Sequence, residues 1–476
     1  MTTSRYLHPL HACLPLVLAL AACTTVGPDY KGAPPVAADA LAQSHFTRDG
    51  GASTAPAPAQ WWRSLNDATL DTLVDDALRD SPTLHAAEAR LRAARASLNQ
   101  QEANRRPSGS ASALGAGVWQ GPTTDQSTSL QLYSVGFDAT WEADLFGGGR
   151  RAVESASAQA QAVQADLADA QVSLAAEVAA TYTDLRAQQA RRALLQQTAA
   201  GDAQALALMR QRRAQGVASA DEVEQRMQQA AATQGTLSDL TADIAASLDR
   251  LALLVGQAPG ALDAQLAATV ASPALPSVPA SVAIGDPAAL LQHRPDIRAA
   301  ERRLAGRTAD IGQQTAKYFP KLNLLGNIGL AGTDAGQLLR ASNLALIAVP
   351  YLSWNVLDFG RTAAAVRQAE AGRDEAVANY QATVLGALQD ANTALARFGQ
   401  QRQTVMQLLA QQASAGRTLE LTQQRRAAGA SSQIDLLDAQ RRDADARVKA
   451  LEGEAQLLKN FVALQKSLGL GWDVAG

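Results

Sequence analysis

Few residues in this sequence have the types and spacing that enzymes use for chemistry. The sequence contains no Gly-x-Ser-x-Gly, no His-Glu-x-x-His and no phosphate loop ending in Gly-Lys-Ser or Gly-Lys-Thr. The run Gly147-Gly148-Gly149 before a helical pattern faintly suggests anion binding. From Cys23 onward, histidines stand only at His45, His85 and His293, a scatter that does not favour a metal site. We therefore expect no enzyme, no cofactor and no bound metal.

The residue expected to be modified is Cys23. Arg5 precedes a short apolar run that begins at Cys13 and ends in small residues, which is the layout of a secretory signal and too short to span a bilayer. Leu20-Ala21-Ala22-Cys23 resembles the bacterial lipoprotein cleavage box, so we expect residues 1–22 to be removed and Cys23 to be acylated. Thr24, in place of Asp, implies the outer membrane. The alternative is a plain signal peptide with a chance cysteine.

The amino-acid composition limits the kinds of partner and of fold that we expect for this chain. A net charge of −3 and a pI near 6.0 give no sign of a nucleic-acid partner. Aromatic residues make up only 4% of the chain, while Ala and Gln are abundant. This mixture favours long helices packed closely through small side chains. With Cys13 removed with the signal, the mature chain retains no cysteine pair for a disulfide or a Cys-based metal site.

An internal repeat organises the chain, in which position n of the first half matches position n + 213 of the second. Ser81-Pro82-Thr83-Leu84 corresponds to Arg294-Pro295-Asp296-Ile297, and Gly148-Gly149 is interpreted as an insertion in the first half. Further matched pairs are Pro107 and Pro320, Trp141 and Trp354, Phe146-Gly147 and Phe359-Gly360, Gly216 and Gly429, and Gly256 and Gly469. Two homologous halves therefore cover nearly the whole mature chain.

The two halves predict the same arrangement of elements. The expected fold class is α+β, with mainly α-helical structure. The expected segments are a signal peptide (1–22), a lipidated linker (23–60), a first repeat (61–257), a linker (258–282) and a second repeat (283–476). In each repeat a helix that stops before Pro107 or Pro320 is followed by two strand-like runs. The predicted strands are 108–119, 129–142, 321–332 and 343–357.

Very long helical patterns follow the strands. Arg150–Arg213 and Arg361–Arg426 contain no proline, and each could reach roughly 95 Å at the usual rise per residue. Glycine-marked turns at Gly216 and Gly429 then stop each helix. A return helix of similar pattern follows each turn, over 221–255 and 435–468.

Four strands of this length and alternation match transmembrane β-strands, but four cannot close a barrel. Open strand edges in lipid would leave backbone groups unpaired, so the chain must oligomerise into barrels of eight, twelve or sixteen strands. The alternatives are a soluble β-sandwich with an appended coiled coil and a plain coiled-coil rod.

The arrangement resembles the outer membrane factor (TolC-like) family, specifically the NodT-type lipoproteins of resistance-nodulation-division (RND) efflux pumps. The resemblance is carried by Cys23 with Val26-Gly27-Pro28-Asp29-Tyr30, by Arg294-Pro295-Asp296-Ile297, by Trp354 to Arg361, and by Arg425 to Gly429 with Leu436 to Arg441. It implies a homotrimer with a twelve-stranded outer-membrane β-barrel, continued by a long periplasmic α-helical barrel. It also implies an equatorial region near Leu70–Ala77 and Pro287–Gln292.

The resemblance further implies a constriction at the periplasmic tip. The matching positions are Ile434, Asp438 and Arg441, and their spacing places them on one helix face. Repeated by symmetry, Asp438 would form an acidic ring that narrows the pore. The alternative is that these are ordinary helix charges, with Asp438 and Arg441 forming a weak i, i+3 pair. The first half has Gln225 at the position of Asp438.

The function we expect is a passive exit channel for drugs or other small solutes. Its expected partners are further copies of itself, a periplasmic adaptor protein that docks at Gly216 and Gly429, an inner-membrane RND pump and outer-membrane lipid. The second hypothesis is the same conduit in type I protein secretion with an ATP-driven exporter. The lipoprotein box and the Val26–Tyr30 run favour the first. A periplasmic spacer without a pore is the third.

Overall fold

The computed structural model describes residues 25–43, 45–48, 55, 58–120, 128–267, 275–288 and 294–472. Cys23 and His293 lie outside these ranges, as do residues 289–292 of the expected equatorial region. The chain divides into two compact units. Unit 1 consists of residues through Pro34, Arg90–Gln164 and Ala299–Gln381, and unit 2 contains the remainder.

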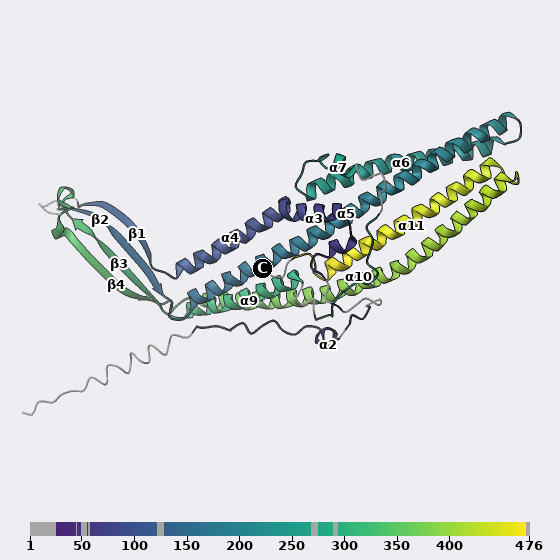
Figure 1. Ribbon diagram of the computed structural model, residues 1–476. Helices are drawn as coiled ribbons and strands as arrows, with labels where there is room; N and C mark the ends of the chain where they lie inside the picture. Colours follow the sequence, from purple (N-terminus) through teal and green to yellow (C-terminus); the bar gives the residue numbers. More distant parts are fainter. Residues whose placement is uncertain are drawn as a thin grey trace, which may run out of the picture. The chain divides into compact units, whose positions relative to one another are not determined.

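The predicted mainly helical chain with four strands and two tandem repeats is confirmed (Figure 1). The first repeat contains α4 (Pro82–Asn104), β1 (Ser108–Gln120), β2 (Thr128–Ala143), α5 (Gly148–Ala214) and α6 (Ala220–Leu254). The second contains α9 (Pro295–Thr315), β3 (Lys321–Gly332), β4 (Leu344–Ser353), α10 (Arg361–Ala427) and α11 (Gln433–Ser467). Except for β2 and β4, each of these elements and its counterpart begin at matched positions, n and n + 213, as the sequence repeat requires.

The expected two-glycine insertion is wrong. Helices α5 and α10 both have 67 residues, and they begin at the matched positions Gly148 and Arg361. Gly148 and Gly149 are therefore the first residues of α5, matched to Arg361 and Thr362. Asp144 accepts hydrogen bonds from the amides of Gly149 and Arg150 (3.1 and 2.8 Å), which satisfies donors that the helix start leaves free.

The four strands of unit 1 form one antiparallel sheet in the order β1-β2-β3-β4. Ser108 faces Thr140, and their counterparts Lys321 and Ser353 face each other in the same way, so both hairpins have the same register. Strand β4 ends at Ser353 rather than at the predicted residue 357. Its partner strand begins only after Pro320, so residues beyond Ser353 have no ladder to join.

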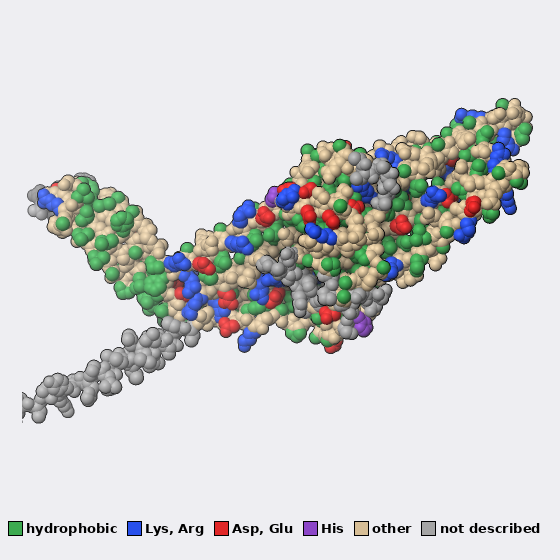
Figure 2. Space-filling view, in the orientation of Figure 1, with side chains coloured by type: hydrophobic (Ala, Val, Ile, Leu, Met, Phe, Trp, Pro, Cys, Tyr) green, Lys and Arg blue, Asp and Glu red, His purple; other side chains and the backbone are tan. Residues whose placement is uncertain are grey.

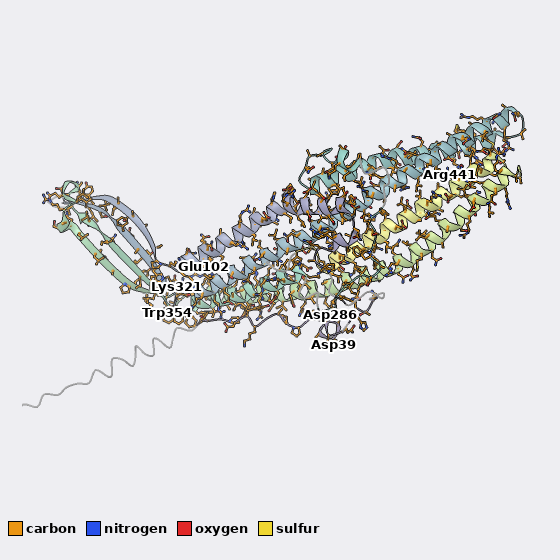
Figure 3. All side chains as sticks on the ribbon, viewed as in Figure 1. Asp39, Glu102, Asp286, Lys321, Trp354 and Arg441 are labelled. Atoms are coloured by element: carbon orange, nitrogen blue, oxygen red, sulfur yellow. The ribbon has the colours of Figure 1, made fainter. Side chains whose placement is uncertain are left out.

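Apolar side chains lie exposed over the sheet (Figure 2). They include Leu114, Leu132, Val135, Phe137, Leu325, Ile328, Leu344, Leu346, Ile347, Val349, Tyr351 and Leu352. At the helix end of the sheet, the Trp141 indole donates to the Arg105 carbonyl and the Trp354 indole to the Tyr318 carbonyl, both at 2.9 Å. Figure 3 labels Trp354 and Lys321 in this region, where helices meet strands. The two bonds are again related by the repeat.

The main hydrophobic core belongs to unit 2. Trp61 and Trp62 come from a 3-10 helix, η1 (Trp61–Leu65), and Trp61 meets both Trp62 and Phe461 edge-on, with ring centroids 5.8 and 5.9 Å apart. Helix α3 (Ala68–Asp80) buries Leu70, Leu73, Val74 and Ala77 in the same core. The side chain of Asp67 caps α3 and accepts from the Tyr182 hydroxyl at 2.9 Å.

Both expected linkers contain ordered pieces. Residues 23–60 include a short helix, α2 (Ala38–Leu41), and the buried side chain of Phe46. Residues 258–282 include α7 (Asp263–Ala267), which the sequence analysis missed. Leu262 and Leu266 enter the core of unit 2, and burial of these two side chains supplies the stabilisation that so short a helix lacks by itself.

Candidate functional site

Two helical hairpins, α5–α6 and α10–α11, carry the predicted gate residues and their partners in unit 2. Ile434, Asp438 and Arg441 lie on the first turns of α11. The Ile434 side chain is buried in a small cluster with Met209 of α5 and Val223 of α6. Ile434 therefore contacts the other hairpin of the same chain.

Asp438 is engaged by an arginine that the sequence analysis did not single out. The Arg226 guanidinium of α6 donates through both terminal nitrogens to the two Asp438 carboxylate oxygens, at 2.5 and 2.8 Å. Both side chains are largely shielded, with 19% and 28% exposed. The hydrogen-bonded carboxylate of Asp438 raises the pKa of the Arg226 guanidinium. Two-point geometry of this kind is among the stronger ion pairs in proteins.

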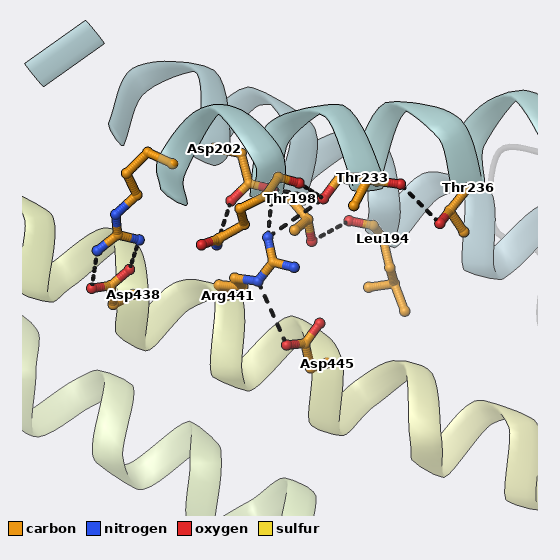
Figure 4. Close-up of polar contacts among 11 residues, drawn as sticks. Leu194, Thr198, Asp202, Thr233, Thr236, Asp438, Arg441 and Asp445 are labelled. Carbon is orange, nitrogen blue, oxygen red and sulfur yellow. Dashed lines mark hydrogen bonds and ion pairs between the residues drawn. The ribbon is translucent and has the colours of Figure 1, made fainter. Parts of the chain in front are cut away.

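Arg441 is held by a second carboxylate from the other hairpin. Its Nη1 donates to Asp202 Oδ2 of α5 at 2.5 Å, and its Nε lies 3.8 Å from Asp445 (Figure 4). Only 5% of the Asp202 side chain is exposed. Its carboxylate also accepts from the Thr233 hydroxyl at 2.7 Å and from the Gln229 amide at 3.1 Å. These donors replace the hydrogen bonds to water that a buried carboxylate loses.

The weak i, i+3 pair of the alternative interpretation does not form. Asp438 and Arg441 do not pair with each other, because each is committed to a different helix of the first repeat. Asp438 is also not a free carboxylate in this arrangement. Gln225, its counterpart, donates instead to Asp221 one turn away, at 2.8 Å. The arrangement joins the two hairpins by two ion pairs and one apolar contact.

Of the two partners that the sequence analysis did not single out, Asp202 and Arg226, only Asp202 has a recognisable signal in the sequence. Asp202 stands alone in the run Ala199-Ala200-Gly201-Asp202-Ala203 of a helix that packs through small residues. A lone carboxylate on such a face requires a buried partner. Arg226 left no comparable signal, since it lies in a return helix with several other charged residues.

The hairpin turns have the geometry that their glycines predict. Gly216 and Gly429 adopt φ of +73° and +75°, a left-handed conformation that favours glycine. Each return helix then begins with a capping box. In the first, Ser219 accepts from the Glu222 amide at 3.2 Å while the Glu222 carboxylate accepts from the Ser219 amide at 2.7 Å.

The second tip repeats this arrangement with Ser432 and Asp435. Hydrogen bonds from the backbone amides and hydroxyls of Ser219 and Ser432 lower the pKa of the Glu222 and Asp435 carboxyls. Both tips are therefore rigidly capped, and their outermost residues remain exposed.

The run Val26–Tyr30 is held in unit 1 by a buried arginine. The Arg151 side chain is only 4% exposed and donates to the Val26 carbonyl (3.1 Å), the Gly27 carbonyl (3.2 Å) and the Asp29 carboxylate (2.6 Å). Desolvation opposes its charge, but hydrogen bonds to Asp29 and Glu154 outweigh this and raise its pKa. The segment directly after Cys23 is thus anchored to the start of α5.

Gly27 and Tyr30 of the same run also make specific contacts in unit 1. A Cβ on Gly27 would lie 2.3 Å from the Gly312 Cα, so only glycine fits this close approach. The Tyr30 hydroxyl donates to Glu301 at 3.1 Å, and burial together with this carboxylate raises the pKa of the phenol.

Among the described residues, no group of three His, Cys, Asp or Glu side chains is placed to hold a metal ion. In the same part of the chain, no helix is both long enough and apolar enough to cross a membrane.

Comparisons with known proteins agree with this architecture. Residues 73–257 and 287–470 match the family model described as outer membrane efflux protein. The chain is 30% identical to the outer membrane protein OprJ of Pseudomonas aeruginosa, over 97% of this chain and 96% of that protein. It is 32% identical to the pyoverdine export outer membrane protein OpmQ of Pseudomonas putida, over 98% of each.

A solved structure of the outer-membrane channel OprN is similar throughout. The superposition has a TM-score of 0.80 with 34% sequence identity, and it covers 94% of this chain and 99% of that one. The match therefore includes both the sheet and the long helices.

Proposed function

The chain belongs to the outer membrane efflux protein family, and we propose that three copies of it form the exit duct of a tripartite pump, with a periplasmic adaptor and an inner-membrane RND pump. It is an outer-membrane efflux channel with a large periplasmic helical part. The observation that carries the proposal is the open four-stranded sheet with exposed apolar side chains, which needs further copies to close in lipid. The duct is passive and carries out no reaction of its own.

The periplasmic gate is the ion-paired region of α11. In the closed state, Arg226–Asp438 and Arg441–Asp202 hold the α10–α11 hairpin against α5–α6. Opening separates the hairpins and exchanges both pairs for water. The capped turns at Gly216 and Gly429 are where the adaptor docks, because they present exposed, rigid ends to an approaching partner.

Cys23 carries the lipid anchor in this proposal. The support is the lipoprotein box in the sequence and the nearby Val26, whose amide donates to the Phe146 carbonyl at 3.1 Å beside the end of β2. A single lipid chain anchors weakly, and the membrane-embedded strands supply the second attachment.

In this proposal the inner-membrane pump, rather than this chain, selects which solutes are transported. OpmQ is described as a pyoverdine export protein, and we propose export of small solutes of this general size. The relatives favour efflux over type I protein secretion.

Capture of partners at the tip tests the proposal. A benzophenone-maleimide probe is attached at Ala430→Cys beside Gly429, and cross-linked proteins from cells are identified by mass spectrometry. Leu339→Cys, in the connection between β3 and β4, is the control site. We expect an adaptor and a proton-driven pump only from the tip. Capture of an ATP-driven exporter would instead support a role in type I protein secretion. Capture of further copies of this chain alone would favour a periplasmic spacer without a pore.

A second test addresses the gate. Replacing Asp438 and Arg441 with Ala is expected to raise single-channel conductance in planar bilayers. Unchanged conductance would contradict the gate assignment and leave the efflux role intact.

A further inference from the structure

The two faces of the sheet in unit 1 carry different kinds of side chain. Along β2 and β3, one face carries apolar side chains, among them Val135, Phe137, Leu324 and Ile328. The charged and amide side chains lie on the opposite face, at Asp138, Glu142, Lys321, Asn323 and Asn327. In a sheet that closes in lipid, the apolar face meets the hydrocarbon and the polar face lines the lumen.

One charge on the polar face has no opposite charge beside it. The four described strands contain three charged residues, Asp138, Glu142 and Lys321. The Lys321 Nζ lies 3.0 Å from both carboxylate oxygens of Glu142, so these two charges cancel. Asp138 accepts hydrogen bonds from the Asn327 amide, at 2.7 Å, and from the Ser112 hydroxyl, and neither donor is charged. Lys321 stands six residues from Asn327 along β3, roughly 20 Å away.

We propose that Asp138 forms an acidic ring inside the β-barrel of the assembled channel, and that this ring makes the open duct favour cations over anions. The ring rests on the trimeric channel proposed above and adds the charge of the solutes that pass most readily. Symmetry places the three copies of Asp138 at one level of the lumen. The repeat-related position is the uncharged Tyr351, so the ring has three charges rather than six. Rings of carboxylates are a general means by which channels select cations.

The Asp138 side chain is accessible from the polar face, where it is only half-buried. Its neighbours in the same row across the sheet are Ser110, Asn327 and Ile347. The next row, on the side away from the helices, consists of Ser112, Gly136, Gly329 and Ala345. None of these four side chains is larger than serine, so no bulky group covers the carboxylate from that side. Ions and solutes in the lumen can therefore approach it directly.

The gate carboxylates are a weaker source of charge selectivity than Asp138. Asp438 is bound by Arg226, and Asp202 is bound by Arg441, so each of these carboxylates has a cation beside it. Opening the proposed gate separates the partners but leaves both signs of charge in equal number at these four positions. The sequence analysis expects an acidic ring at Asp438, whereas the uncompensated carboxylate of the structure lies in the sheet.

Coulomb's law gives the size of the expected preference. A closed barrel of twelve strands, spaced about 4.8 Å apart and tilted by about 40°, has a backbone radius of about 12 Å. Side chains that reach inward by about 3 Å place the carboxylates about 9 Å from the axis. Three charges at this distance in water enrich monovalent cations over anions about fivefold at about 0.15 M salt, and hardly at all at about 1 M.

Reversal potentials of the full-length channel in planar bilayers test the ring. All channels carry Asp438→Ala and Arg441→Ala, which open the proposed gate and remove one charge of each sign. With KCl at about 0.15 M on one side and about 0.05 M on the other, we expect a potential whose sign shows cation preference. Asp138→Asn, which retains the size of the side chain, should bring this potential close to zero. Asp138→Lys should reverse its sign.

A neutral exchange on the same face is the matched control. Glu142→Gln with Lys321→Gln removes one charge of each sign, so it should leave the reversal potential unchanged. Single-channel conductance in about 1 M KCl, where screening suppresses the effect of the ring, should be equal in all variants. Equal conductance under this condition shows that the variants form the same pore.

The outcomes separate this inference from the proposed function. Conducting channels without cation preference would overturn the ring and leave the channel intact. The same holds if Asp138→Asn retains the full preference, or if the neutral control loses as much of it. A lower conductance of Asp138→Asn in about 1 M KCl would assign Asp138 a structural role instead. Failure of the chain to conduct at all, with or without substitutions, would overturn the proposed channel together with the ring.

Discussion

Replacing Arg226 with Ala removes the ion pair that holds Asp438 against α6. Two short hydrogen bonds are lost, at 2.5 and 2.8 Å. Hydrogen bonds to charged groups contribute about 1.5–3 kcal/mol. The pair is partly exposed, so solvent screening reduces this to about 1 kcal/mol in each copy. In the proposed gate, the closed tip loses this contribution, whereas the open tip, in which the pair is already broken, does not.

In the proposed trimer, the effect of the substitution is multiplied by three. If the three hairpins open together, the closed state loses about 3 kcal/mol, which changes the closed-to-open ratio about a hundredfold. An open state populated at about 0.1% would rise to about 10%. We therefore expect Arg226→Ala channels in planar bilayers to show frequent high-conductance openings where the parent shows rare ones.

Matched variants isolate the mechanism. Arg250→Ala removes an exposed arginine of the same helix that pairs with Glu177 inside the first hairpin, and it should leave gating unchanged. The charge exchange Arg226→Asp with Asp438→Arg should restore part of the closed population. The reasoning is refuted if Arg226→Ala and Arg250→Ala gate alike, or if the exchanged pair opens as readily as Arg226→Ala.

Three further results are expected. Arg151→Ala should speed hydrogen exchange at the Val26 amide about tenfold or more, since it frees the segment next to the proposed lipid anchor at Cys23; unaltered exchange would contradict the anchoring of this segment by Arg151. Lowering the pH should loosen the tips: the Glu222 and Asp435 carboxyls have lowered pKa values in the folded state, so their stabilisation is complete above about pH 4.3 and is lost as the pH falls through the lower folded values. Hydrogen exchange at the first turns of α6 and α11 measures this, and a rate that does not rise at low pH refutes it. Phe461→Ala should lower the free energy of unfolding by about 3–5 kcal/mol, because its ring is only 2% exposed; a thermal midpoint equal to that of the parent would contradict this.

Much of the fold is readable from the sequence because its signals are local or repeated. Helix periodicity, stop glycines at Gly216 and Gly429, and prolines before the strands are properties of short segments. The internal repeat then transfers each assignment between halves. The small-residue run 108–119 is predicted to be a strand only through its match to 321–332, and the structure places β1 over 108–120. The end of β4 escaped prediction because pairing with β3, not local pattern, decides it.

The functional contacts depend on packing between segments far apart in the chain. Spacing alone places Asp438 and Arg441 on one helix face, but their partners lie 212 and 239 residues away. Arg151 likewise holds Asp29 across 122 residues. An ion pair requires its atoms to meet within about 3 Å in a shielded place. Periodicity specifies a face, whereas only the docking of one hairpin on the other determines which charge meets it.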